Sequence, residues 1–381
     1  MLKQQKIFFD FLRFCIGSAK EIPGSLKEVD WKELYAIAQK QALLGVLFYG
    51  IQRLPKELAP EQKLLMQWMV MAEMIRKQNI RLFLDSVKVC KNFEKEGFAN
   101  CILKGQGNAL LYPDPYMRTP GDIDIYLAGG RKRVMKYVNK VCPNQVMRYH
   151  HVDFPVMKTA IEVHFTPSYM FFPIHNSRMQ KWFKEVMGEQ CNHRVSLPDG
   201  YGEIHVPQVS FNVIYILSHL YRHIFTEGIG LRQLLDYYFV FLKWHTDLTN
   251  LTNSNNSLPQ MTQINTDLDA LRHELKYLGL WKFAGAVMYV LHEVFGLSED
   301  RMIAPMDERE GRFLLAEIMR GGNFGQYDDR MGSKVGESKI HRYFRMNLRN
   351  LRFVKHYPTE ALSEPLFRTW FALWKKIHGI R

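Results

Sequence analysis

Apolar and polar positions change their spacing twice along the chain, and these changes divide it into three regions. Through residues 1–96 the apolar residues recur three and four positions apart, as do Leu64, Trp68, Met71 and Ile75. This period is typical of amphipathic α-helices that bury one face. The pattern therefore predicts an N-terminal helical region.

The middle region, residues 97–206, has shorter and more varied apolar runs. Phe98–Leu103 and Ile123–Leu127 are short apolar segments followed by glycine turns, which predicts two buried strands. Val146–Phe154 and Thr159–Phe165 alternate in a way that predicts two antiparallel strands. A helix is expected between the two pairs of strands. We therefore expect an α+β core with a small mixed sheet.

Helical spacing returns in residues 207–381, with Phe211–His223 and Gly230–Leu242 as the clearest segments. Residues 250–265 are rich in Asn, Thr and Ser, which predicts an exposed linker. This third region is expected to be a C-terminal helical region. Together the three regions predict an α+β protein whose small sheet is flanked by helices at both ends.

The charge of the chain is uneven. Lys and Arg outnumber Asp and Glu by 51 to 38, a net charge of +13, and residues 331–381 carry eleven basic and three acidic side chains. A basic surface attracts phosphate groups of nucleotides or nucleic acid, and it is equally typical of a solvated helical face. The charge alone leaves both interpretations open.

Cysteine content and hydropathy bear on where the protein works. The five cysteines are widely spaced and form no Cys-x-x-Cys pair. This pattern suits a reducing compartment, so a cytoplasmic protein is expected. No apolar run reaches the roughly 18 residues of a membrane-spanning helix, so no membrane span is expected.

The sharpest chemical feature is a pair of carboxylates, Asp122 and Asp124, at a predicted strand. Side chains two residues apart on a strand point to the same face, where two like charges repel unless a cation neutralises them. Oxygen ligands of this kind suit Mg²⁺ or Mn²⁺. Glu162 lies between apolar neighbours in another predicted strand, which could present a third carboxylate to the same metal.

A phosphate-binding turn is predicted just upstream. Lys104 and Gly105 follow the strand Phe98–Leu103, so the turn would offer an ammonium and backbone amides to a triphosphate. Arg118, four residues before Asp122, is a candidate second phosphate contact.

The segments LKG, YPDPYMRTPGDIDIYL and IEVHF resemble the uncharacterised nucleotidyltransferase-like family within the polymerase-β-type nucleotidyltransferase superfamily. The resemblance implies a polymerase-β-like nucleotidyltransferase core and a metal-dependent transfer of a nucleotidyl group from a nucleoside triphosphate. It implies that Asp122 and Asp124 are metal ligands and that Glu162 is the third acid. The acceptor, whether a small molecule, a protein or an RNA, is not indicated.

Two other classes of function stay open at this point. The superfamily has Gly-Ser where this chain has Lys104-Gly105-Gln106, so a catalytically inactive nucleotide- or RNA-binding protein with the same fold is one alternative. A pure interaction scaffold is the other. A scaffold would pair the two Asp residues with Lys or Arg and have no pocket beside them.

Overall fold

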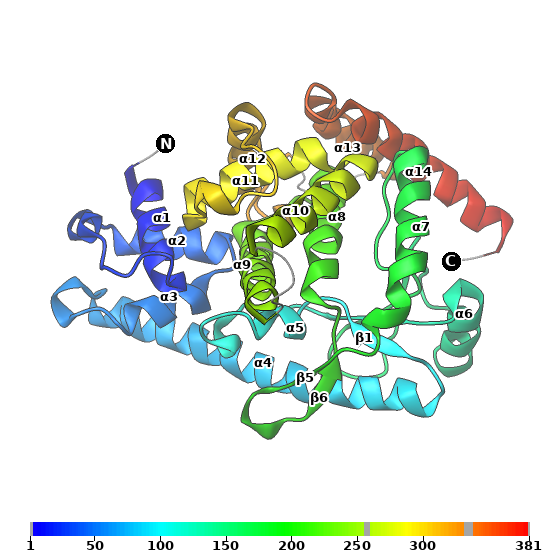
Figure 1. The fold of residues 1–381 in the computed structure, drawn as a ribbon, viewed down its shortest axis with the longest axis horizontal. Helices are drawn as coiled ribbons and strands as arrows, with labels where there is room; N and C mark the ends of the chain where they lie inside the picture. Colours follow the sequence, from blue (N-terminus) through cyan, green and yellow to red (C-terminus); the bar gives the residue numbers. More distant parts are fainter. Residues whose placement is uncertain (1–2, 255–259, 331–337, 380–381) are drawn as a thin grey trace. The chain divides into compact units, whose positions relative to one another are not determined.

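The computed structural model describes residues 3–254, 260–330 and 338–379 (Figure 1). They form two compact units, each assembled from three separate stretches of the chain. The first unit draws on residues 1–79, 111–119 and 226–336, and the second on residues 80–110, 120–225 and 337–381. The long helix α4 (Gln62–Lys95) contributes residues to both. The division into three regions, with boundaries near residues 97 and 207, describes the sequence pattern and stays a prediction.

The first unit is helical, as the spacing of its apolar residues predicts. Asp30 caps α2 by accepting hydrogen bonds from the backbone amides of Lys32 and Glu33. Helix α1 packs against α3 and α11, so helices from distant parts of the sequence build one core (Figure 1). Besides the first half of α4, the α-helices of this unit are α1 (Lys3–Ile16), α2 (Trp31–Lys40), α3 (Leu44–Ile51), α9 (Leu231–Ser254), α10 (Gln260–Tyr277), α11 (Trp281–Phe295) and α12 (Glu308–Gly321).

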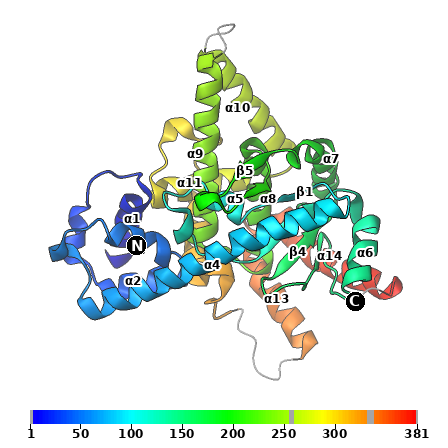
Figure 2. The same cartoon turned by 90° about the horizontal axis from the view of Figure 1, so that it is seen from below.

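Helices extend into both ends of the predicted linker at residues 250–265, and its exposure stays a prediction. Helix α9 continues to Ser254 and α10 begins at Gln260, whereas residues 255–259 lie outside the described residues. The two helices lie side by side (Figure 2). Asn, Thr and Ser cost only about 0.5–0.7 kcal/mol each in a helix, and packing of α9 against α10 offsets such a cost.

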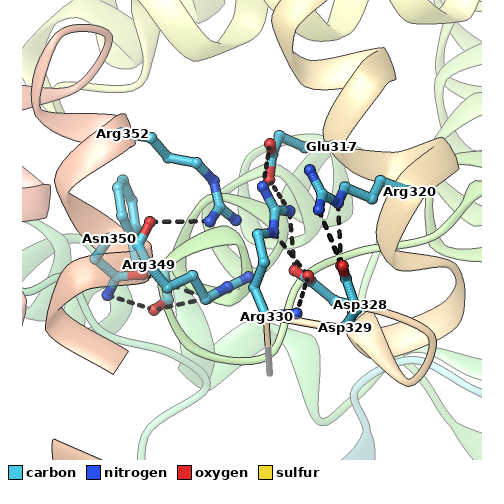
Figure 3. Close-up of polar contacts among 9 residues, drawn as sticks. Glu317, Arg320, Asp328, Asp329, Arg330, Arg349, Asn350 and Arg352 are labelled. Atoms are coloured by element: carbon cyan, nitrogen blue, oxygen red, sulfur yellow. Dashed lines mark hydrogen bonds and ion pairs between the residues drawn. The ribbon is translucent and has the colours of Figure 1, made fainter. Parts of the chain in front are cut away.

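A cluster of ion pairs holds the segment that follows α12 in the first unit. Arg330 contacts Glu317 at 2.9 Å and Asp328 at 2.7 Å, and Arg320 contacts Asp329 at 3.0 Å (Figure 3). Arg330 and its two partners are largely withdrawn from solvent. These pairs therefore tie the turn after α12 back to that helix.

The second unit contains the sheets. Its four-stranded sheet has the order β1-β2-β4-β3, and β5 and β6 form a separate hairpin. The sheet is mixed, because β2 and β4 are parallel while β1–β2 and β3–β4 are antiparallel. The protein is therefore α+β with a small mixed sheet, as predicted. The strands are β1 (Asn100–Ile102), β2 (Ile123–Leu127), β3 (His151–Asp153), β4 (Ile161–His164), β5 (Arg194–Ser196) and β6 (Glu203–His205).

One face of the four-stranded sheet is apolar. Ile123, Ile125 and Val163 are fully buried there, as alternation along β2 and β4 requires. Phe93 of α4 packs on Phe154, which continues this face beyond β3. The helices of this unit, besides the second half of α4, are α5 (Gln106–Ala109), α6 (Gly130–Val141), α7 (Pro173–Gln190), α8 (Val209–Thr226), α13 (Lys339–Val354) and α14 (Pro358–Ile377).

The basic C-terminal helices are anchored within the second unit by buried polar groups. On α13, Arg349 and Asn350 both donate hydrogen bonds to the backbone carbonyl of Phe225 (Figure 3). On α14, the buried carboxylate of Glu360 accepts hydrogen bonds from the amides of Phe171 and Phe172. At least part of the basic segment thus serves the fold itself. Among the described residues, no helix combines the length and the hydropathy needed to span a membrane.

Candidate functional site

The opposite face of the four-stranded sheet carries the acidic and histidine side chains of the candidate site. Parallel pairing of β2 with β4 sets Asp124 directly beside Glu162, and antiparallel pairing of β4 with β3 sets Glu162 beside Asp153. Three carboxylates therefore form a row across the sheet. In the next row, Tyr126, His164 and His151 lie side by side in the same way. The register thus brings acids and imidazoles together from three strands.

Asp124 lies at the centre of a buried ion-pair network. Its Oδ2 is 3.1 Å from Lys104 Nζ, and its Oδ1 accepts a hydrogen bond of 3.0 Å from His164 Nε2. Burial acts to raise the pKa of Asp124, but the charge of Lys104 and the contact with His164 outweigh it and lower the pKa. Asp124 is therefore ionised, and both of its oxygens have a partner.

Asp122 precedes β2 by one residue and is half-buried. The negative charge of Asp124, followed by burial, raises the pKa of Asp122 to about 6. Lys104 acts in the opposite direction but does not cancel the repulsion. The pair thus carries negative charge that a divalent ion would relieve, as expected for two metal-ligating carboxylates.

Because of this repulsion, we expect Asp122→Asn to stabilise the metal-free protein by roughly 1–3 kcal/mol at pH 7.5. The folded protein holds the Asp122 proton up to a pH of about 6, because the pKa of this carboxyl is raised well above its ordinary value of 3.8. The contribution of Asp122 to the free energy of unfolding of wild type therefore falls as pH rises from about 4 to 6. The amide introduced by Asp122→Asn does not titrate, so the variant shows no such fall. Urea unfolding with a chelator should show the difference at pH 7.5 and none near pH 3.5.

Asp199→Asn is the matched control for that experiment, since Asp199 is exposed on a turn with a positive φ of 50° that Asn also tolerates. A stabilisation that is equal at both pH values would contradict the proposed charge repulsion at Asp122.

Lys104 and Gly105 lie where the sequence predicts a turn, between β1 and α5. Gly105 adopts a positive φ of 63°, which favours glycine. Lys104 Nζ donates to His219 Nε2 at 3.0 Å in addition to its contact with Asp124. The ammonium therefore already compensates a carboxylate, and its predicted contact with phosphate stays a prediction.

Arg118 belongs to the first unit, where it has a carboxylate partner. Its Nε and Nη2 both donate to Asp236 at 2.7 Å, and Tyr112 donates to the same carboxylate. Both side chains of the ion pair are almost completely buried. Burial opposes ionisation of Asp236, but the charge of Arg118 prevails and lowers the pKa of Asp236. The assignment of Arg118 as a phosphate contact stays a prediction.

Sequence motifs alone assign no role to His164, His151 and His150. Nevertheless, His151-Val152-Asp153 and Glu162-Val163-His164 have the same alternation as Asp122-Ile123-Asp124, and this signal could have placed their polar side chains on one face. Ligand atoms of Asp124, Glu162 and His164 lie within 4.8 Å of one another, as do those of His151, Asp153 and Glu162. The structure thus brings together two of the three predicted metal ligands and adds imidazoles to them.

Burial and the neighbouring carboxylates act in opposite directions on the protonation of these histidines. Burial opposes protonation of His164, but hydrogen bonds to Asp124 and Glu162 outweigh it and raise the pKa of His164. For His151, burial and then the charge of His164 lower the pKa to about 2. Burial likewise holds the pKa of His150 well below its usual range. His150 and His151 are therefore neutral, whereas the contacts of His164 with Asp124 and Glu162 favour its protonated form.

A cavity of about 600 Å³ lies in the same unit. Tyr126, the next residue after Asp124 on the same face of β2, lines it together with Gly130, Lys181 and Lys184. This volume falls within the range of pockets for small molecules. Tyr126 thus reaches the cavity from the face of β2 that also carries Asp124, whereas Asp124 and Glu162 do not line it.

The amino-acid sequence matches a known protein family. Residues 27–296 match the sequence profile of a family described as uncharacterised nucleotidyltransferase, which is more than half of the chain. The chain therefore belongs to this family of nucleotidyltransferases. The matched residues include every strand of the four-stranded sheet. The match confirms the family resemblance seen in the segments LKG, GDIDIYL and IEVHF. No curated protein and no solved structure matches the chain.

Proposed function

We propose that the protein is a divalent-metal-dependent nucleotidyltransferase that moves a nucleoside monophosphate from a nucleoside triphosphate to a hydroxyl acceptor. The observation that carries this proposal is the register of β2 and β4, which sets Asp124 beside Glu162. A carboxylate pair followed by a third acid on the neighbouring strand is the arrangement that the family resemblance implies. Family membership supports the reaction class.

The carboxylates fit a divalent ion. Asp122 and Asp124 repel each other strongly enough to raise the pKa of Asp122 to about 6, so together they carry more negative charge than Lys104 compensates. Asp122, Asp124 and Glu162 would hold Mg²⁺ or Mn²⁺ in this proposal. When bound, such an ion supplies positive charge against the triphosphate and the attacking oxygen.

The chain's own residues would align and activate the reactants. An acceptor hydroxyl attacks the α-phosphorus, a new P–O bond forms, the bond to the bridging oxygen of the β-phosphate breaks, and pyrophosphate leaves. Glu162, whose side chain is 30% exposed, would take the hydroxyl proton. Lys104 would turn from Asp124 to a phosphate oxygen once the carboxylates are otherwise neutralised. The cavity beside Tyr126 is proposed to hold part of the nucleotide or the acceptor.

A labelling experiment tests this proposal. The protein is incubated in cell extract with each nucleoside triphosphate, labelled either at the α- or at the γ-phosphate, and with Mg²⁺ or Mn²⁺. Transfer of the α-label but not the γ-label to an acceptor is expected. Transfer of the γ-label would instead indicate a phosphotransferase and contradict the proposal.

A catalytically inactive nucleotide- or RNA-binding protein is the second candidate. The contact that favours it is Lys104 with Asp124 at 3.1 Å, because this pair neutralises a catalytic carboxylate without a metal. In that case the protein would retain labelled nucleotide or RNA in the same extract and produce no labelled acceptor. RNA binding would weaken steeply with salt, because each neutralised phosphate releases counterions.

A further inference from the structure

A second group of metal-ligand atoms lies next to the carboxylates. His150, His151 and His164 each offer one ring nitrogen, and these three atoms lie within 4.8 Å of one another. The ring centroids are 4.4 Å apart for His150 and His151, and 5.1 Å apart for either ring and His164. All three side chains are buried, at 8% exposure or less. Three imidazoles packed this closely in a core are a typical ligand set for a metal ion.

Two ring nitrogens of this group lack hydrogen bonds. Among the described residues, Nδ1 of His150 and Nδ1 of His164 have no partner, although both are buried. A buried polar atom without a partner costs about 1–3 kcal/mol, so native proteins rarely leave one unexplained. Metal coordination by these atoms would supply the missing partners.

The surroundings of His164 match those of a metal-ligating histidine. Its Nε2 donates to Asp124 Oδ1 at 3.0 Å, so the ring is oriented by a carboxylate while Nδ1 is left for another partner. Ligating histidines commonly donate their second ring N–H to a carboxylate, which fixes the tautomer and orientation. His150 and His151 also orient each other, with 3.2 Å between His150 Nε2 and His151 Nδ1.

The donor atoms indicate the class of ion. Mg²⁺ prefers oxygen ligands in octahedral geometry, whereas imidazole nitrogens suit Zn²⁺ and its neighbours among the transition metals. Glu162 Oε2 lies 3.3 Å from His151 Nδ1 and orients that ring, as Asp124 orients His164. We propose that His150, His151 and His164 form a binding site for one Zn²⁺-class ion, distinct from the ion held by Asp122 and Asp124.

Zn²⁺ binding at this site does not depend on nucleotidyl transfer, so the Zn²⁺ site and the proposed transferase function can be tested independently. Asp122→Asn should lower Mg²⁺- or Mn²⁺-dependent transfer by at least about 10³-fold and retain Zn²⁺ binding. His150→Gln should weaken Zn²⁺ binding by more than about 100-fold, since loss of even an outer-shell partner costs roughly 10–100-fold. His273→Gln, which changes an exposed histidine on α10, is the matched control and should leave the affinity unchanged.

Calorimetry on the untagged, chelator-stripped protein in excess Mg²⁺ measures these affinities. One equivalent of Zn²⁺ is expected to bind wild type and to raise its melting temperature, with both effects lost in His150→Gln. If the variant does not fold, X-ray absorption spectroscopy of Zn²⁺-loaded wild type tests the proposal instead. The expected result is a Zn²⁺ ligand shell that contains three imidazoles. No binding by wild type, unchanged affinity in a folded His150→Gln, or a shell of oxygens alone would overturn the proposal.

Discussion

Asp122→Asn is expected to lower the rate of nucleotidyl transfer by at least about 10³-fold, because removing even one preorganised electrostatic contact costs roughly 10²–10³-fold in an active site. The substitution keeps the size of the side chain and removes the charge that would hold the ion. It also relieves the repulsion from Asp124 that raises the pKa of Asp122 to about 6. The variant should therefore be more stable and far less active than wild type.

This opposite effect on stability and rate separates a metal ligand from a structural residue. Asp124→Asn should lower the rate as much, but it should also destabilise the protein because Lys104 and His164 lose their ionised partner. Rates measured with saturating Mn²⁺, beside Asp199→Asn as the exposed control, test both expectations. Full activity in Asp122→Asn would remove the two-carboxylate metal site from the mechanism.

Asp236→Asn is expected to destabilise the protein by about 3–5 kcal/mol, the usual cost of breaking a buried ion pair from one side. Asp236 receives two hydrogen bonds from Arg118 and one from Tyr112, each 2.7 Å long. The carboxylate has a lowered pKa, so its contribution is present above the unfolded pKa near 4 and is lost as pH falls below it.

Asp247→Asn on the same helix provides the control. Asp247 pairs with Lys243 on the exposed side of α9, where such a pair contributes at most about 1 kcal/mol. Chemical denaturation at pH 7 should therefore separate the two variants clearly. Equal stability of Asp236→Asn and Asp247→Asn would show that the Arg118 pair does not stabilise the first unit.

Local patterns were sufficient to predict several parts of the site. Ile123–Leu127 is a strand with the bounds that its apolar run predicts, and the turn at Gly105 lies where a strand was expected to end. The antiparallel pairing of the two later strands is confirmed by β3 and β4. Each of these features depends on neighbouring residues, which is why one stretch of sequence predicts it.

The partners of the predicted carboxylates could not be obtained in this way. Glu162 lies beside Asp124 only because β4 pairs with β2 in a particular register, and a shift of one residue would turn Glu162 to the apolar face. His151 reaches His164 through the register of β3 with β4. Helix α7 and the hairpin β5–β6 were also not predicted, since their short or irregular apolar pattern carries little periodic signal.

By itself, the sequence determined the α+β class, the helical first region, the position of the carboxylate strand and the family, because periodicity and motif spacing are local properties of a chain. Only the tertiary structure decided that each compact unit combines three separated stretches, that Arg118 pairs with Asp236, and that imidazoles join the acid row. These features depend on strand register and on contacts between distant residues. Such contacts are selected by how well whole elements bury their apolar faces together, a property that no single stretch of sequence contains.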